Sequence, residues 1–539
     1  MKKMFFGLII FLSFYSLVTY AQSLPVGTSV LEDYYRRAQL LGKLDATSSF
    51  CSRPLFPSKA FGISVFYPDS SLTMNGKGIF HLLPINILNQ YNSHHPEGIN
   101  DGSIIPSRGY QTQLSAGIYF KYGPLSVQLR PEFVYAQNDK SPTDIKYPNS
   151  PYAYNIDLPE RFGNSSYNET SWGQSSIRLT VGPLSLGVSN ENLWWGPGYR
   201  NTLLMTNSAP GFKHITLNSV KPIKTWVGSF EGQIIAGKLE SSGFTENIRD
   251  EWRYINAMNL TYNPKWIPGL FLGINRSFLI YNKDIGSSFG DYLPVFTLFS
   301  KSSLGGDEVV NNMGQNQIFS LFMRWLFIEA QGEIYFEYGR EDHFWNLTDL
   351  ILEPSHSSGY IFGLHKLFLL NKQKETYLQL IMESTHLSTN QTSINRNNGG
   401  AMGHWYEHSS IQQGYTHKGQ MLGAGIGPGS NLQTIDISWV KSIKQIGIQV
   451  ERYVHNNDFW FNHIKDLRFN WVDLNTMIYA NWDYKNFLFS VKFKFIKSYN
   501  YQWMYQPIYV DNTPTFWANA KNYNNFQGQI GITYRFLNF

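Results

Sequence analysis

The sequence predicts an all-β fold: an antiparallel β-barrel of about 18 strands that spans an outer membrane, preceded by a short helical segment on its periplasmic side. Three observations lead to this prediction. The chain begins with a secretory signal, no later run of about 18 apolar residues could form a transmembrane helix, and short segments of alternating apolar and polar residues recur along the chain. Of the 539 residues, 16% are aromatic and only 15% are charged, which is low for a water-soluble chain.

The amino-terminal stretch Met1–Ala21 is expected to be removed on export. It has two lysines, then the apolar run Met4–Val18, then small residues before Gln22. The single cysteine, Cys51, cannot form an internal disulfide, so an exported chain must be stabilised in another way. The expected organisation is a signal peptide at 1–21, a periplasmic amino-terminal segment with a helix at 22–80, and an outer-membrane barrel at 81–539.

The stretch Val30–Leu44 is the clearest helix in the sequence. Leu31, Tyr35 and Ala38 recur at helical spacing on one face, and the charged residues lie elsewhere. Because this stretch follows closely on the signal, the helix is expected on the periplasmic side of the barrel.

Strands are predicted from about residue 108, where apolar residues begin to recur at every second position. The turns YGPLSV and VGPLSL, around residues 123 and 182, are near copies, and each joins two alternating runs. Large apolar residues on one face and charges on the other, with almost no helix to cover them, favour lipid outside and a polar lumen inside. The roughly 430 residues after position 107 accommodate about 18 strands, at ~10 residues per crossing. The aromatic-terminated last run, GITYRFLNF, resembles the assembly signal of such barrels.

Connection lengths predict the orientation, because outer-membrane barrels have short periplasmic turns and long external loops. The connections expected in the periplasm are short: Gly123-Pro124, Gly182-Pro183, the corner Trp325–Phe327, Lys441–Lys444 and Lys485-Asn486. The segments expected outside are long: Ala136–Ser171, Gly339–Ser358, Leu387–Leu432, Asn456–Asn475 and Ser498–Asn525. The amino-terminal segment and the carboxyl terminus then lie in the periplasm.

A tryptophan pair, Trp194-Trp195, precedes a Gly-Pro-Gly break in a stretch rich in amide and charged side chains. A strand that leaves the turn at residue 183 runs outward, so the pair is expected at the external rim. One interpretation is a platform on which sugar rings stack while polar side chains bond hydroxyls; the other is an interfacial aromatic belt. Successive strand residues point to opposite faces, so at most one tryptophan can face lipid. The candidate polysaccharide-binding residues here are Glu191, Asn192, Trp194, Trp195, Tyr199, Arg200 and Asn201.

A dense charged segment is expected at the same rim. Its candidate binding residues are Arg340, Asp342, His343, Asp349 and Glu353. Hydrogen bonding to a glycan, a metal site and a salt-bridged loop that plugs the lumen are the three alternatives. A metal is not expected, because the segment lacks the His-x-x-x-His spacing of a helical site. His404 and His408 have that spacing, but they lie in a Gly-, Asn- and Ser-rich loop without a helical pattern, so a zinc hydrolase is not expected either.

The remaining charged residues predict a wet inner wall in which opposite charges pair. They are Arg130, Glu132, Arg178, Glu329, Glu333, Glu451, Lys492 and Lys494. No nucleophile motif, phosphate loop or carboxylate pair indicates an enzyme, and no cofactor is expected. The net charge of +5 is small for this length and gives no sign of nucleic-acid binding.

An ordered set of blocks resembles a known family. The blocks are YRRAQLLGKLDATSSF (Tyr35–Phe50), YNSHHPEGINDGSIIP (Tyr91–Pro106), LRPEFVYAQN (Leu129–Asn138), NENLWWGPGYRNTLLMTNSAPGF (Asn190–Phe212), EYGREDHFWNLTDLILEPSHSSGYIFGL (Glu337–Leu364) and GYTHKGQMLGAGIGPGSN (Gly414–Asn431). They are similar to those of Wzi-type capsule-assembly outer-membrane proteins in the form common in Bacteroidetes.

The resemblance implies a barrel of about eighteen strands with a periplasmic helical segment, acting without catalysis as a lectin for capsular or other surface polysaccharide. The expected partners are that polysaccharide, outer-membrane lipid and the barrel-assembly machinery. From the residues alone, a diffusion channel for carbohydrate or small solutes is the alternative.

Overall fold

A computed structural model describes residues 22–57, 78–140, 162–163, 165–243, 249, 251–296, 314–341, 347–352, 355, 357–390, 405–408, 410–464, 466, 468, 470–504, 509–510, 513–514 and 521–537. Among these residues, no helix has the length and apolar character needed to cross a membrane.

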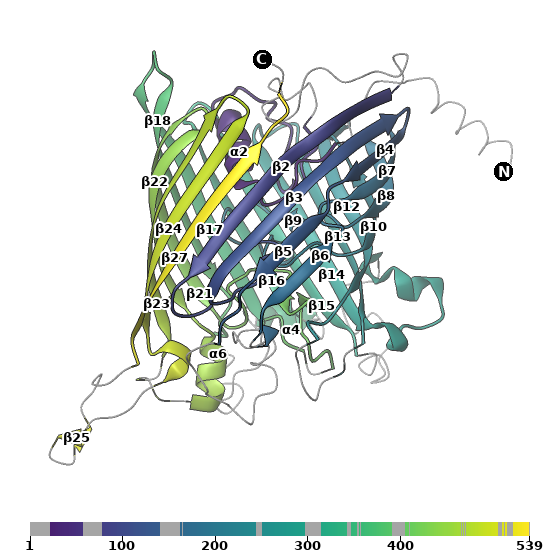
Figure 1. Ribbon diagram of the computed structural model, residues 1–539. Coiled ribbons are helices and arrows are strands. Elements are labelled where there is room, and N and C mark those ends of the chain that lie inside the picture. Colours follow the sequence, from purple (N-terminus) through teal and green to yellow (C-terminus); the bar gives the residue numbers. More distant parts are fainter. Residues whose placement is uncertain are drawn as a thin grey trace.

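The chain forms a closed antiparallel barrel of 18 strands (Figure 1). The wall consists of β2 (Gly78–Asn92), β3 (Gly109–Tyr122), β4 (Leu125–Leu129) with β5 (Glu132–Ala136), β6 (Tyr167–Ser171) with β7 (Ser176–Val181), β8 (Leu184–Ser189), β10 (His214–Ser219), β12 (Gly228–Leu239), β13 (Arg253–Pro264), β14 (Leu270–Tyr281), β15 (Asn316–Phe327), β16 (Gly332–Glu341), β17 (Ser358–Asn371), β18 (Thr376–His386), β21 (Asn431–Lys441), β22 (Lys444–Val454), β23 (Val472–Tyr484), β24 (Phe487–Tyr499) and β27 (Tyr523–Tyr534). β3 pairs with both β4 and β5, which are the two halves of one interrupted strand. The last strand, β27, pairs with the first, β2, and closes the wall.

The remaining elements are short strands and helices. The short strands are β1 (Ser52–Arg53) with β9 (Trp194–Trp195), β11 (Ile223–Lys224), β19 (Thr416–His417) with β20 (Gln420–Met421), and β25 (Tyr509–Val510) with β26 (Thr513–Pro514). The helices are α2 (Ser29–Leu40), α4 (Leu347–Leu352), α6 (Asn457–Phe459), η3 (Asn282–Asp284), η4 (Phe289–Tyr292), η5 (Pro294–Phe296), η8 (Trp460–Ile464) and η10 (Tyr501–Trp503).

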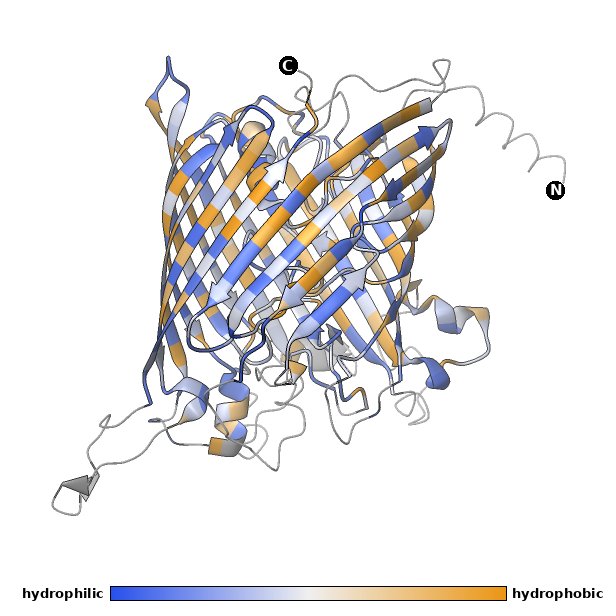
Figure 2. Ribbon diagram, viewed as in Figure 1, coloured by the Kyte–Doolittle hydropathy of each residue, from blue (hydrophilic) through white to orange (hydrophobic). Residues whose placement is uncertain are grey.

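The wall is apolar outside and polar inside, as the alternating sequence predicts. On β7, Ile177 and Leu179 are exposed while Arg178 between them is 1% exposed. Figure 2 shows the same alternation as successive apolar and polar bands along neighbouring strands. A closed wall that exposes aliphatic and aromatic side chains is stable only where those side chains contact lipid.

The connections divide between the two ends of the barrel. The turns at 123–124, 182–183, 442–443 and 485–486 lie at one end, here called the short-turn end, and the long segments lie at the opposite, long-loop end (Figure 1). One predicted corner is wrong: Trp325–Phe327 belongs to β15, and the turn follows at 328–331. The sequence is continuously apolar from Trp325 through Ile328, so the pattern did not mark where the strand ends.

Residues 22–57, here called the amino-terminal segment, lie within the barrel rather than beside it. Helix α2 occupies the lumen near the short-turn end (Figure 1). Its apolar face, with Leu31, Tyr35 and Ala38, packs against Ile443 and Leu488 of the barrel. The helix ends four residues before the predicted Leu44, because Gly42 adopts a left-handed backbone with φ +66°.

Charged residues fasten the amino-terminal segment to the inner wall. Glu333 of β16 accepts hydrogen bonds from Arg36 Nε (2.6 Å) and from Arg324 Nε of β15 (2.7 Å), and all three side chains are buried. Arg324 also donates to Gln39 Oε1 at 2.9 Å and to the Ser49 carbonyl at 2.7 Å. The predicted pairing of wall charges is therefore present, but one partner comes from the amino-terminal segment.

Candidate functional site

The tryptophan pair lies on a segment that folds into the barrel. β8 has six residues and ends at Ser189, and the wall resumes at His214 of β10, which pairs with β8. The intervening residues 190–213, here called the lumen segment, therefore leave the wall before the long-loop end. Trp195 is fully buried and Trp194 is 4% exposed. The prediction of an exposed external platform is wrong, because it assumed a strand long enough to reach the rim.

Neither tryptophan faces lipid. Trp195 belongs to the central apolar core, and its indole Nε1 donates to Gln233 Oε1 of β12 at 3.0 Å. Trp194 borders the lumen, with the guanidinium carbon of Arg53 4.9 Å from its ring centroid. The pair also forms a two-residue ladder with Ser52 and Arg53 of the amino-terminal segment.

Glu191 anchors the start of the lumen segment. Its carboxylate pairs with Arg178 Nη2 at 2.5 Å and accepts hydrogen bonds from the Ser23, Gln128 and Ser189 side chains. Burial by itself would raise the pKa of Glu191, but Arg178 and the hydroxyl donors lower it below its usual value. The carboxylate is therefore charged, and both of its oxygens already accept hydrogen bonds from these side chains. Asn192 is similarly buried and bonds Gln174 and Asn207.

A tight turn at residues 198–201 is held by one wall carboxylate. Glu383 of β18 accepts the backbone N–H groups of Tyr199 (2.7 Å), Arg200 (3.1 Å) and Asn201 (2.9 Å). The Tyr199 hydroxyl lies 2.7 Å from His365 Nδ1, and the Arg36 guanidinium covers its ring at 3.8 Å. Burial raises the pKa of Tyr199 well above its usual value, so the hydroxyl stays protonated.

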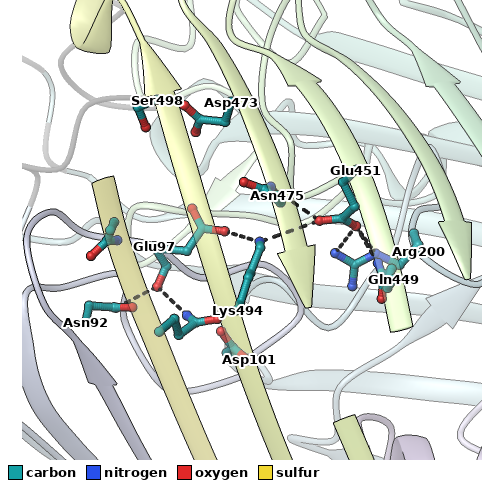
Figure 3. A network of polar contacts seen from close by, with 12 residues as sticks. Asn92, Glu97, Asp101, Arg200, Gln449, Glu451, Asp473, Asn475, Lys494 and Ser498 are labelled. Carbon is teal, nitrogen blue, oxygen red and sulfur yellow. Dashed lines mark hydrogen bonds and ion pairs between the residues drawn. The ribbon is translucent and has the colours of Figure 1, made fainter. Parts of the chain in front are cut away.

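Arg200 belongs to a chain of charges across the lumen (Figure 3). Its Nη2 lies 2.7 Å from Glu451 Oε1, and Lys494 Nζ lies 2.5 Å from Glu97 Oε1 and 3.5 Å from Glu451 Oε2. Burial would lower the pKa of Arg200, but Glu451 and Glu383 raise it above its usual value. The chain joins the lumen segment to the inward-folded loop 93–108 and to the wall strands β22 and β24.

Of the second predicted segment, the structure describes only part of the chain. Arg340 is 1% exposed within β16, and Asp349 lies in α4. Asp342, His343 and Glu353 lie outside the described residues. Contact between the two segments occurs inside the barrel, where Glu337 Oε2 accepts the Leu203 N–H at 3.2 Å. Within the described ranges, no group of three His, Cys, Asp or Glu residues could hold a metal ion.

The sequence analysis missed an aromatic cluster at the long-loop end. Trp471 stacks on His455 with centroids 3.6 Å apart and meets Trp503 edge to face at 5.3 Å. The half-buried Trp460 packs on this cluster and presents part of its ring to solvent. The residues come from two separate loops, 455–471 and 500–522, so only their aromatic composition could have indicated them.

The lumen also contains a cavity of about 330 Å³, here called the lumen cavity. The amino-terminal segment borders it on one side and the inner wall on the other, with Trp194, Tyr199 and Arg200 among its lining residues. Three of the predicted residues are thus brought together, but around an internal space.

Comparison with known proteins identifies the family. The model of a family described as capsule assembly protein Wzi matches residues 87–499, most of the chain. The chain belongs to the Wzi family. No curated protein sequence matches it.

One solved structure shares the Wzi fold. It is described as Wzi, an outer-membrane protein of Escherichia coli involved in group 1 capsule assembly and a carbohydrate-binding β-barrel. The identity is 14% and the TM-score 0.62, with 96% of this chain and 100% of that chain covered. OccK7 (OpdD) of Pseudomonas aeruginosa matches at 9% identity and a TM-score of 0.38, covering 85% and 99%. That second likeness is too low to support an argument about this Wzi-family chain.

Proposed function

We propose that the protein binds capsular or another surface polysaccharide at the outer membrane and holds it at the cell surface. The main support for this proposal is that the chain belongs to the capsule-assembly family. The occupied lumen is consistent with it. We infer that the long-loop end faces outward and that the short-turn end, with the amino-terminal segment inside it and the end of β27 beside it, faces the periplasm. Barrels of this class have short periplasmic turns and long external loops, which supports the assignment.

We assign polymer binding to the aromatic cluster at the long-loop end. The lumen segment, deeper in the barrel, supports the long loops. Aromatic faces stack on sugar rings, and Trp460 is one of the half-buried residues that pack on this cluster. Glu191, Asn192, Trp195, Asn201 and Arg340 are too deeply buried to touch a polymer outside. We assign them to positioning, because they hold the lumen segment and wall in place. Catalysis plays no part in this proposal.

Trp460→Ala is expected to weaken polymer binding by roughly 3- to 10-fold, since an aromatic contact contributes about 0.5–1.5 kcal/mol. The measurement is retention of purified polysaccharide from the producing strain by the detergent-solubilised protein. Trp266→Ala is the matched control, because Trp266 is 67% exposed in the turn at 265–269, at the short-turn end. Equal loss in both variants would contradict the assignment to the long-loop end. Unchanged cell-associated polysaccharide after gene deletion would contradict the function itself.

A channel is the alternative function, and the described residues oppose it. The central core fills the lumen with apolar side chains from the lumen segment, from loop residues 405–426 and from the wall. Porins, in contrast, keep a water-filled interior. In a planar bilayer the purified protein is expected to give almost no steady ion current. Regular porin-like conductance steps that persist in independent preparations would favour the channel.

A further inference from the structure

The lumen cavity lies apart from the aromatic cluster. It extends from the lumen segment toward the short-turn end, where Gln445, Leu488 and Thr533 line it within two residues of their strand ends. Its volume of about 330 Å³ is at the lower end of the range of small-ligand sites, roughly 300–1,000 Å³. A site at this end of the range suits one sugar unit better than a long chain.

Amide side chains recur around the wall of this cavity. They come from different strands around the barrel: Asn86, Gln113, Gln379, Gln445, Asn481 and Gln529. An amide offers both donors and an acceptor, and a sugar hydroxyl likewise donates and accepts. The lining is therefore complementary to a molecule that carries many hydroxyl groups.

Several of these polar groups are buried and have no hydrogen-bond partner among the described residues. Gln379 is fully buried, and both its amide oxygen and its amide nitrogen lack a partner. The Trp194 indole Nε1 and the Asn481 amide oxygen are in the same state. Leaving such a group unsatisfied costs about 1–3 kcal/mol. These groups make the surroundings of the cavity polar, and the half-buried amides Asn86 and Gln113 are lining groups that a molecule inside it can reach.

The charges of the lining favour a neutral ligand. Acidic and basic side chains are equally numerous, five of each. Three of the cations already have carboxylate partners: Arg36 with Glu333 at 2.6 Å, Arg53 with Glu32 at 3.6 Å, and Arg200 with Glu451 at 2.7 Å. With acids and bases equal in number and most of the cations paired, the lining has no excess of positive charge that would favour an anionic sugar.

We infer that the lumen cavity is a second saccharide site that takes about one neutral hexose unit, reached from the short-turn end and separate from the polymer surface. The inference rests on the proposed function, because it assigns a short glycan to a polysaccharide-binding barrel. Half-buried amides of the wall, among them Asn86 and Gln113, bond the sugar hydroxyls.

The test uses the full-length protein in detergent and the methyl glycosides of glucose, galactose and mannose, with glucuronate as the charged comparator. Binding is measured by saturation-transfer NMR and calorimetry. At least one neutral glycoside is expected to bind, and Gln113→Leu, which removes a half-buried lining amide, to weaken it about tenfold. Ser490→Phe, which places a ring in the cavity, is expected to abolish binding. Gln433→Leu is the matched control, because Gln433 lies on the exposed outer face of β21.

Absence of binding by the unmodified protein would overturn the inference, as would binding unchanged in both cavity variants. Tighter binding of glucuronate than of every neutral glycoside would overturn the neutral class. Polymer retention is measured on the same preparations. If the unmodified protein retains polymer but binds no glycoside, only the cavity assignment fails; if it retains no polymer, the proposed function fails.

Discussion

Replacing Glu333 by alanine is expected to lower the free energy of unfolding by about 3–5 kcal/mol, the usual cost of removing one partner from a buried ion pair. The carboxylate is fully buried and joins Arg36 of α2 to Arg324 of β15, with His365 Nδ1 at 3.4 Å. Without it, two guanidinium groups remain buried beside each other. Helix α2 then loses its strongest tie to the wall.

Urea unfolding followed by tryptophan fluorescence measures this loss, and protease sensitivity of the amino-terminal segment reports release of α2. Glu375→Ala is the matched control. Glu375 also pairs with the amino-terminal segment, through Lys43 at 2.8 Å, but its side chain is 61% exposed. Such an exposed pair contributes about 0–1 kcal/mol. Similar destabilisation by both substitutions would show that burial of the Glu333 pair is not what fastens the helix.

Gly198→Ala is expected to displace the turn that holds the lumen segment, at a cost of about 3 kcal/mol or more. A Cβ atom at this position would lie 1.8 Å from the Asn201 carbonyl oxygen and 3.4 Å from Glu383 Oε2. Backbone must therefore move, and the three N–H groups that converge on Glu383 move with it. Polysaccharide retention is expected to fall together with stability, since the lumen segment supports the long loops.

The measurements are the urea midpoint and the fraction of protein in outer membranes that keeps folded mobility on an unheated gel. Gly290→Ala is the control, because a Cβ there meets nothing within 4 Å. A Gly198→Ala protein with unaltered midpoint and retention would refute the supporting role of the turn.

The wall could be predicted from the sequence because it depends on local periodicity. Residues such as Ile177 and Arg178 alternate between lipid and lumen at every step, so a short stretch already specifies strand and face. Helix α2 was predicted for the same reason, at the period of 3.6 residues. Its end was predicted less well, since the left-handed backbone at Gly42 depends on one residue rather than on a repeat.

The position of the candidate site could not be predicted in the same way. Trp194 and Trp195 have the composition of an exposed sugar platform, but the length of β8 and the contacts of Glu191 place them in the lumen. Those contacts join residues that are distant in sequence, so no local sequence pattern predicts them. The same holds for the cluster around Trp471, whose members come from separate loops.

The position of the amino-terminal segment has a consequence for folding kinetics. Its ties to the wall join residues 297 positions apart, as for Arg36 and Glu333, or 405 apart, as for Arg37 and Ser442. The wall itself closes only when β27, the last strand, pairs with β2. Contacts of such long range make folding slow, because loop-closure entropy is lost before the contacts form. The amino-terminal segment must therefore wait for most of the chain before it can form its contacts with the wall.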